Sequence, residues 1–309
     1  MPIQPAGRSG IAIAVMLLAP LMFSTNLIFG KSAVEEIAPF TLAFVRWALV
    51  AAILAPLLAR ERVALASLLR RDWPLVVLLG FLGMWICGAL VYVAIAHTSA
   101  TNGTLIYTTS PAIIILLEAA LSGRRIGARE AVGCVIAFLG VAVIVLRGDA
   151  SALLRLEFNI GDLLFVASAF AWAVYSILYR SSRLATLSTP ALLGIVAAAG
   201  ALIVLPFAAW EFIAGDPMPV TASAWQGIAG IVIVASLLAF SAFQFGVRVL
   251  GPSVAGIFMY LLPPYGVLLA ATVLGEAFET YHALGIALVL GGIVLATFPL
   301  RWLRDRLGY

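Results

Sequence analysis

The chain has 309 residues, of which 64% are hydrophobic and only 10% are charged. A typical soluble domain is about 25% charged, so this composition argues against a soluble protein and predicts an outer surface that faces lipid. The net charge of +4 does not indicate a nucleic-acid partner, because the basic residues are spread over short segments between apolar stretches.

Ten apolar segments follow one another along the chain, each about 20 residues long and so able to cross a hydrocarbon core of about 30 Å as a helix. They are expected at residues 10–30, 38–58, 74–96, 102–122, 128–146, 161–180, 189–210, 223–246, 253–274 and 281–300. Helices are required because lipid offers no partner for backbone N–H and C=O groups. The first segment is too long for a signal peptide and is expected to remain as the first span.

The distribution of lysine and arginine predicts the orientation. If the N-terminus is cytoplasmic, the inner segments carry 14 of the 18 basic residues and the outer segments carry three, with Arg46 inside a span. Basic residues concentrate on the cytoplasmic side of membrane proteins. The sequence therefore predicts that the N-terminus and the C-terminus both lie in the cytoplasm.

Residues of the same type recur at a near-constant spacing along the chain. The matches are Lys31 with Arg180 at an offset of 149, Gly133 and Gly140 with Gly285 and Gly292 at 152, and Gly103 and Tyr107 with Gly256 and Tyr260 at 153. This spacing predicts two five-helix repeats, at residues 10–147 and 161–301. A unit with an odd number of crossings places its second copy upside down, so the expected fold is an all-α membrane protein with two inverted repeats. Such repeats hold the substrate at their interface.

A series of short motifs accompanies the repeats. They are Phe23-Ser24-Thr25-Asn26, Lys31, Pro39, Arg46 and Pro111 in the first, and Trp172-Ala173, Arg180, Pro263 and Gly275-Glu276 in the second. In this order the motifs resemble those of the ten-helix EamA branch of the drug/metabolite transporter superfamily, over about residues 10–300. Phe23-Ser24 replaces the Trp-Gly of the family, and Gly123-Arg124 replaces Gly-Glu. Within this branch the chain looks most like the bacterial aromatic amino acid exporters of the YddG type, which implies metabolite export.

The first and sixth spans each carry a stripe of aromatic, amide and small residues at helical spacing. The stripes are Phe23, Asn26 and Gly30, and Trp172, Tyr175 and Tyr179. Aromatic faces stack on planar groups, and an amide both donates and accepts hydrogen bonds. We interpret these stripes as walls of a pocket for a planar apolar group with polar ends. The alternative is plain helix packing, with Tyr179 in an aromatic belt at the membrane surface.

Four further spans offer candidate pathway residues. The fourth and ninth contain Gly103, Tyr107 and Pro111, and Gly256, Tyr260, Pro263 and Pro264, while the third contains Trp85 and Tyr92 and the eighth contains Gln244. Glycine lets helices approach closely, and proline frees backbone carbonyls, so these glycines and prolines are candidates for helix flexing. Close packing with a kink explains the same residues, and a lipid-facing position is the alternative for Trp85.

Two charges lie inside spans. Arg46 lies about 12 Å below the outer end of its helix, where a charge costs about 2.5–3.5 kcal/mol. It could bind a substrate carboxylate. We favour a structural role, in which Arg46 contacts backbone carbonyl groups or extends its side chain to the membrane surface. Glu118 lies about 24 Å below the outer end of its own helix and is expected to pair with Arg124 and Arg125.

The charge pattern also bears on mechanism and substrate. Proton-driven antiporters usually hold a carboxylate at mid-membrane, and this sequence has none there, so we expect export driven by the substrate gradient. A nearly uncharged interior favours neutral or zwitterionic metabolites, above all aromatic and other apolar amino acids. A multidrug exporter or another metabolite exporter of the same superfamily is the alternative.

The sequence predicts neither an enzyme nor a cofactor-binding protein. His97 and His282 lie near the expected outer surface without metal-ligand spacing, and no catalytic motif is present. The expected partners are a small-molecule substrate and the lipid bilayer. The chain is expected to be a monomer with multiple spans in the bacterial cytoplasmic membrane.

Overall fold

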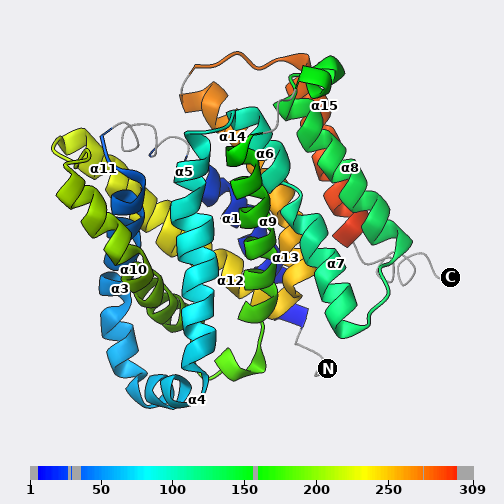
Figure 1. Ribbon diagram of the computed structural model, residues 1–309. Helices are drawn as coiled ribbons and strands as arrows, with labels where there is room; N and C mark the ends of the chain where they lie inside the picture. The colour runs from blue at the N-terminus through cyan, green and yellow to red at the C-terminus, as the bar shows by residue number, and fades with distance from the viewer. Residues whose placement is uncertain (1–5, 27–28, 30–35, 156–158, 274, 298–309) are drawn as a thin grey trace.

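The computed structural model describes residues 6–26, 29, 36–155, 159–273 and 275–297, and within these residues every regular element is helical (Figure 1). In this part of the chain nine helices are long and apolar enough to cross a membrane, and a shorter apolar helix lies at Ser9–Ser24. The expected all-helical membrane fold is therefore confirmed. The expected first span continues past Ser24 into residues outside the described part.

The elements of the first repeat are short where glycine or proline interrupts a span. They are α1 (Ala6–Ser24), α3 (Pro39–Arg60), α4 (Arg62–Gly80), the π-helical η1 (Phe81–Leu90), α5 (Val91–Ile95), α6 (Ala100–Tyr107), α7 (Ser110–Ser122) and α8 (Ala128–Val145). A short 3-10 helix, η2 (Ala150–Arg155), lies between the repeats. Together α4, η1 and α5 make the third span, and α6 and α7 make most of the fourth.

The second repeat follows the same plan. Its elements are α9 (Ile160–Tyr179), η3 (Ser182–Leu184), α10 (Thr189–Ala214), α11 (Ala222–Gly230), the π-helical η4 (Ile231–Leu238), α12 (Ala239–Leu250), α13 (Pro252–Phe258), the 3-10 helix η5 (Met259–Leu261), α14 (Leu262–Val273) and α15 (Thr280–Thr297). The eighth span consists of α11, η4 and α12, and the ninth of α13, η5 and α14.

Local sequence explains several helix ends. Asn159 and Asp162 form a capping box at the start of α9, in which each side chain accepts the other residue's backbone N–H. Gly123 and Gly215 end α7 and α10 with positive φ angles of 67° and 78°, a conformation that glycine adopts without strain. The two glycines therefore explain where α7 and α10 end.

The third span begins earlier than residue 74, where it was expected. Helix α4 starts at Arg62, and its backbone leaves helical geometry at Asp72, with φ −130° and ψ 23°. The break lies two residues before Pro74, which cannot donate a backbone N–H and disfavours helix just before it. With the orientation that the basic residues predict, the first part of α4 runs across the cytoplasmic end, which is lowest in Figure 1.

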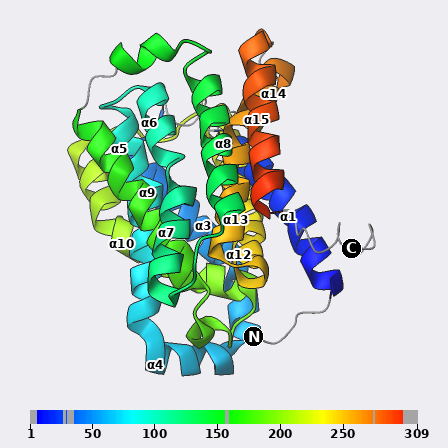
Figure 2. The same ribbon diagram turned by 90° about the vertical axis from the view of Figure 1, so that its right-hand side faces the viewer.

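Glycine contacts between α8 and α15 show the symmetry of the repeats. A Cβ atom added to Gly133 would lie 2.6 Å from the carbonyl oxygen of Gly292, and one added to Gly140 would lie 2.7 Å from that of Gly285. The two helices are therefore antiparallel and in backbone contact, side by side in Figure 2. Because Gly133 corresponds to Gly285 and Gly140 to Gly292, one contact maps onto the other by a twofold rotation. Because these two equivalent helices are antiparallel, the twofold axis runs across them and inverts one repeat relative to the other, so the inverted arrangement is confirmed.

Other helix pairs obey the same twofold relation. Helices α3 and α10 correspond in the repeats and pack together. The packing of α1 on α12 corresponds to that of α9 on η1 and α5. The π-helical segments also correspond, since η1 begins at Phe81 and η4 at Ile231. Segments of this type often occur near functional sites.

Candidate functional site

The fourth span is broken near its middle. Helix α6 ends at Tyr107 and α7 begins at Ser110. Pro111 explains the break, because its nitrogen cannot donate the hydrogen bond that would reach the carbonyl of Tyr107. The expected flexing position at Pro111 thus coincides with a real interruption of the helix.

The ninth span is broken at the corresponding place. The tight 3-10 turn η5 separates α13 from α14, just before Pro263 and Pro264. These prolines leave the carbonyls of Met259 and Tyr260 without their usual helical donors. The nearby carbonyl of Leu262 accepts a hydrogen bond of 2.9 Å from the hydroxyl of Ser24 in α1.

A small recess lies between the two breaks. Its walls are Tyr107, Thr108, Ser110 and Pro111 from the fourth span, Trp172 from α9, and Met259 and Leu262 from the ninth. It has space for about one water molecule, so it is nearly closed in this conformation. Residues from both repeats meet here, as expected of a site at the interface of inverted repeats with discontinuous helices.

Trp172 joins this recess to a cluster of aromatic rings. Its ring stacks on Tyr175 at 5.6 Å and meets Phe23 edge-on at 6.2 Å. Phe240 and Phe243 of α12 complete the cluster at 5.7 and 4.8 Å from Trp172. Phe23 and Trp172, predicted as walls of a pocket, are therefore brought together. Phe240 and Phe243 were not predicted, although their spacing with Gln244 along one helical face was a usable signal.

Gln244 connects two tyrosines on the cytoplasmic side of this cluster. Its side-chain nitrogen donates to the hydroxyl of Tyr175 at 2.5 Å, and the hydroxyl of Tyr179 donates to its oxygen at 2.9 Å. All three residues are buried. Tyr179 therefore lies in the protein interior and not in an aromatic belt at the membrane surface. In this conformation the three side chains fill the space between α9 and α12.

Trp85 and Tyr92 of the third span have different surroundings, because η1 is a π-helix and its residues do not follow α-helical spacing. Trp85 stacks on Phe81 at 5.2 Å and lies beside Phe207 of α10, apart from the aromatic cluster. Tyr92 points to Arg46 instead.

The corresponding tyrosines of the broken spans each contact a cysteine. The hydroxyl of Tyr260 lies 3.1 Å from the sulfur of Cys134 in α8, and the hydroxyl of Tyr107 lies near the sulfur of Cys87 in η1. Tyr107 also lines the recess, whereas Tyr260 points towards α8.

The remaining predicted small and amide residues have different surroundings. Gly103 lies directly against the ring of Phe165, and Gly256 against Ile114, so both allow close helix packing. The side-chain oxygen of Asn26 is buried and has no hydrogen-bond donor among the described residues. Gly30 lies outside the described residues.

Arg46 is buried in the protein and does not reach to the membrane surface. Its guanidinium donates to the hydroxyl of Ser236 at 2.5 Å, to the carbonyl of Ala235 at 3.3 Å and to the hydroxyl of Tyr92 at 3.2 Å. Ser236 and Ala235 belong to the π-helical η4. The expected contact with a carbonyl group is present.

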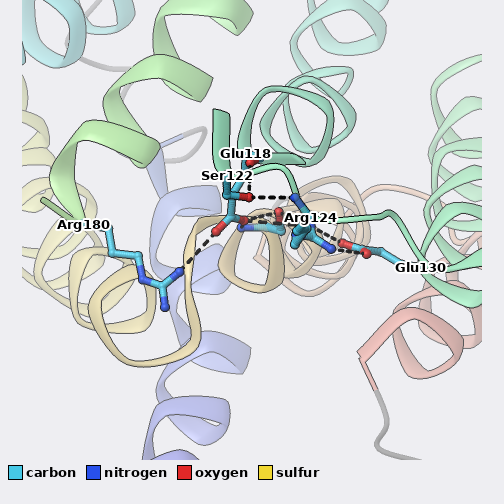
Figure 3. Close-up of polar contacts among 6 residues, drawn as sticks. Glu118, Ser122, Arg124, Glu130 and Arg180 are labelled. Carbon is cyan, nitrogen blue, oxygen red and sulfur yellow. Dashed lines mark hydrogen bonds and ion pairs between the residues drawn. The ribbon is translucent and has the colours of Figure 1, made fainter. Parts of the chain in front are cut away.

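Glu118 occupies the centre of a polar network at the cytoplasmic end (Figure 3). Its carboxylate lies 3.2 Å from Arg180 at the end of α9 and accepts the backbone N–H of Ser253 at 3.1 Å, together with the Ser253 hydroxyl. Arg124 is more distant, at 4.0 Å. The expected pairing with Arg124 is therefore its weaker contact, and no ion pair with Arg125 appears among the described residues.

Arg124 extends the network to α8. It forms two hydrogen bonds of 2.6 and 2.7 Å with Glu130 and one of 2.9 Å with Ser253. Hydrogen bonding to Glu130 raises the pKa of Arg124 above its usual value, so its positive charge persists at any physiological pH. Because Glu118 and Arg124 belong to the first repeat, and Arg180 and Ser253 to the second, the network links the two halves.

Replacing Glu118 with glutamine should lower the free energy of unfolding by about 1–3 kcal/mol, because the variant loses a charged acceptor of several hydrogen bonds. A double-mutant cycle with Arg180→Gln, measured by unfolding in detergent, should give a coupling of at least about 0.5 kcal/mol. Glu211→Gln with Arg180→Gln is the control cycle and should be additive, because Glu211 bonds to Thr41 at the opposite end of the molecule. Additive effects of the Glu118 and Arg180 variants would contradict a direct pair.

Two buried carboxylates lie at the opposite, outer end, where the sequence did not predict them. Asp162 accepts hydrogen bonds from the side chains of Thr98 and Asn102. Glu211 accepts both the backbone N–H of Thr41, at 2.7 Å, and its hydroxyl, at 2.9 Å, at the start of α3. Asn102 is itself buried. Asp162 could have been found from the Asn159-x-x-Asp162 capping pattern.

Known proteins match the chain along almost its whole length. The model of the EamA-like transporter family matches residues 10–146 and 159–298. A crystal structure matches with a TM-score of 0.76 at 25% identity, and the match covers 97% of this chain and 99% of that one.

Among curated relatives, the uncharacterized transporter YetK of Bacillus subtilis is 26% identical over 91% of this chain and 85% of its own. The aromatic amino acid exporter YddG of Ancylobacter novellus is 27% identical over 94% and 98%. A probable amino-acid metabolite efflux pump of Escherichia coli is 25% identical over 93% and 94%.

These matches confirm the resemblance drawn from the motifs, and an aromatic amino acid exporter is among the relatives. The family consists of transporters, so the expectation of a transporter and not an enzyme is confirmed. The apolar helices and the bacterial relatives place the chain in the inner membrane as a multi-pass protein. This chain belongs to the EamA-like transporter family.

Proposed function

We propose that this chain exports zwitterionic amino acids with aromatic or other large apolar side chains, as a monomer, by alternating access between its repeats. The observation that carries the proposal is the recess between the two broken spans, where Trp172 connects to a cluster of aromatic rings. Broken helices at a repeat interface are typical substrate sites of secondary transporters. The named activities of two relatives, an aromatic amino acid exporter and a probable amino-acid metabolite efflux pump, support the same substrate class.

The charge of the site supports a zwitterionic substrate over an organic cation or a phosphate ester. No Asp or Glu lines the recess in the described part of the chain, and the nearby charge is that of Arg46. A carrier of cationic drugs needs a buried acid, and a phosphate ester calls for several buried cations. A zwitterion requires neither.

The contacts on the cytoplasmic side suggest how the cycle proceeds. Tyr175, Gln244 and Tyr179 fill the space between α9 and α12, and the network of Glu118, Arg180 and Ser253 joins the repeats below them. We propose that these contacts close the inner side and separate when the carrier loads substrate from the cytoplasm. Two discrete packings of this kind are the basis of alternating access.

Uptake by proteoliposomes tests this proposal. The purified full-length chain should take up labelled L-phenylalanine down its concentration gradient with equal pH on both sides, because none of the described residues that line the recess is a carboxylate that could couple a proton. Unlabelled tryptophan, tyrosine and methionine should compete, and protein-free liposomes are the control. Complete dependence on a pH gradient would refute gradient-driven transport, and strong competition by lipophilic cations alone would favour a multidrug exporter.

A further inference from the structure

We propose that Arg46, together with Trp47 and Tyr92, binds the carboxylate of the transported substrate. This inference rests on the proposed function and specifies which end of the substrate the protein recognises. It starts from the chemistry of Arg46, a buried cation in the second span, in α3.

Arg46 has polar partners but no counterion among the described residues. Its printed hydrogen bonds go to the hydroxyls of Ser236 and Tyr92 and to the carbonyl of Ala235. Its guanidinium also packs 4.7 Å from the ring centre of Trp47. A buried charge that has only neutral partners is unfavourable unless an opposite charge joins it. Guanidinium also has five N–H donors, so an entering carboxylate finds donors that the present partners leave available.

Trp47 supplies a second donor without a partner. Its ring is fully buried, and its indole N–H has no acceptor in the described part of the chain. The N–H faces Gly88 of η1, where an added Cβ atom would lie 2.8 Å from the indole nitrogen. Glycine at this position leaves the donor uncovered by a side chain. An unsatisfied buried N–H beside an uncompensated cation is the arrangement that a carboxylate would complete.

The cation lies next to the aromatic cluster that we assign to the substrate's side chain. The ring of Phe240 is 5.9 Å from the Arg46 guanidinium, 4.9 Å from Trp47 and 5.7 Å from Trp172. Phe240 therefore lies next to both the charged group and Trp172. An aromatic amino acid carries its carboxylate and its ring a few bonds apart, so one molecule could contact both.

The test is a binding competition with the purified full-length protein in detergent, with labelled L-phenylalanine as the probe. The competitors are 3-phenylpropionate, which keeps the carboxylate and lacks the ammonium group, and phenethylamine, which lacks the carboxylate. The wild-type protein should bind 3-phenylpropionate at least about tenfold more tightly than phenethylamine, as expected for charge-assisted hydrogen bonds. Arg46→Gln should abolish this preference, and Arg46→Lys should retain part of it.

Two further variants separate recognition from folding. Trp47→Phe keeps an aromatic ring and removes only the N–H, and it should weaken 3-phenylpropionate binding by about three- to tenfold without changing phenethylamine binding. Arg248→Gln is the matched control, because Arg248 is also a partly buried arginine but bonds to the carbonyls of Leu184 and Leu187. Its competitor preference should equal that of the wild type.

The possible results distinguish this inference from the proposed function. If the wild-type protein binds phenylalanine but shows equal affinity for the two competitors, the carboxylate site is overturned and the proposed function stands. If Arg46→Gln binds every compound equally less well and keeps the preference, Arg46 is structural and the inference is overturned. If the wild type binds no amino acid, the proposed function and this inference fall together.

Discussion

Leucine in place of Gly292 is expected to abolish the folded protein. A Cβ atom at this position would lie 2.5 Å from the backbone nitrogen of Ala137 and 2.5 Å from the carbonyl oxygen of Gly133. These are backbone atoms of the facing helix, so α8 and α15 must separate to admit any side chain. Overpacking of a core usually costs about 1–3 kcal/mol. We expect a larger cost here, because the atoms in the way belong to a helix backbone and cannot move aside as a flexible side chain can.

The neighbouring glycine provides a matched control in the same helix. Gly291 has no atom within 4 Å of an added Cβ, so Gly291→Leu should leave folding unchanged. Both variants can be measured by size-exclusion chromatography and thermal unfolding in detergent. We expect a monodisperse peak for Gly291→Leu, and aggregation or a markedly lower melting temperature for Gly292→Leu. Equal stability of the two variants would contradict the glycine-mediated contact and the twofold relation built on it.

Alanine in place of Trp172 is expected to lower the uptake of aromatic amino acids by about tenfold. Trp172 both lines the recess and packs against Tyr175, Phe23, Phe240 and Phe243. Its removal takes away the face on which an aromatic side chain would stack. Threonine, which cannot stack, should lose much less, so the ratio of phenylalanine to threonine uptake reports the stacking contact directly.

Trp210→Ala is the control for this variant. Trp210 is 73% exposed on the surface of α10, so its removal should change neither uptake nor the ratio of the two substrates. Uptake is measured in proteoliposomes and normalised to the amount of reconstituted protein. An equal loss of phenylalanine and threonine uptake in Trp172→Ala would show that Trp172 supports packing and does not stack on the substrate.

The fold was largely predictable because its determinants are periodic in the sequence. Apolar length defines a span, and the matching glycines of the fifth and tenth spans occur at a constant offset, which the contacts of Gly133 with Gly292 explain. The π-helical segments were not predictable in this way. They have contacts with distant parts of the chain, such as the hydrogen bond from Arg46 to Ser236 of η4, and local periodicity does not show such contacts.

The candidate site was predicted less completely, for a related reason. Helical spacing shows which residues share a face, so Phe23 and Trp172 could each be assigned to a stripe on its own helix. It does not show which helices face each other, and the aromatic partners from α12 were therefore missed. Trp85 lies beside Phe81 and Phe207, apart from the aromatic cluster, and η1 as a π-helix does not follow α-helical spacing. The partners of Glu118 lie 62 and 135 positions away in the chain, and the spacing of residues within one helix does not show such distant contacts.

Counterflow measures the central claim most directly, namely that the two inverted repeats form a carrier for amino acids. Proteoliposomes that contain the purified chain are preloaded with unlabelled L-phenylalanine and diluted into labelled L-phenylalanine at equal pH. We predict a transient accumulation of label inside that saturates with concentration, because a carrier exchanges one bound molecule for another. Equilibration without a transient excess, at a rate that rises linearly with concentration, would indicate a channel and contradict the proposed mechanism.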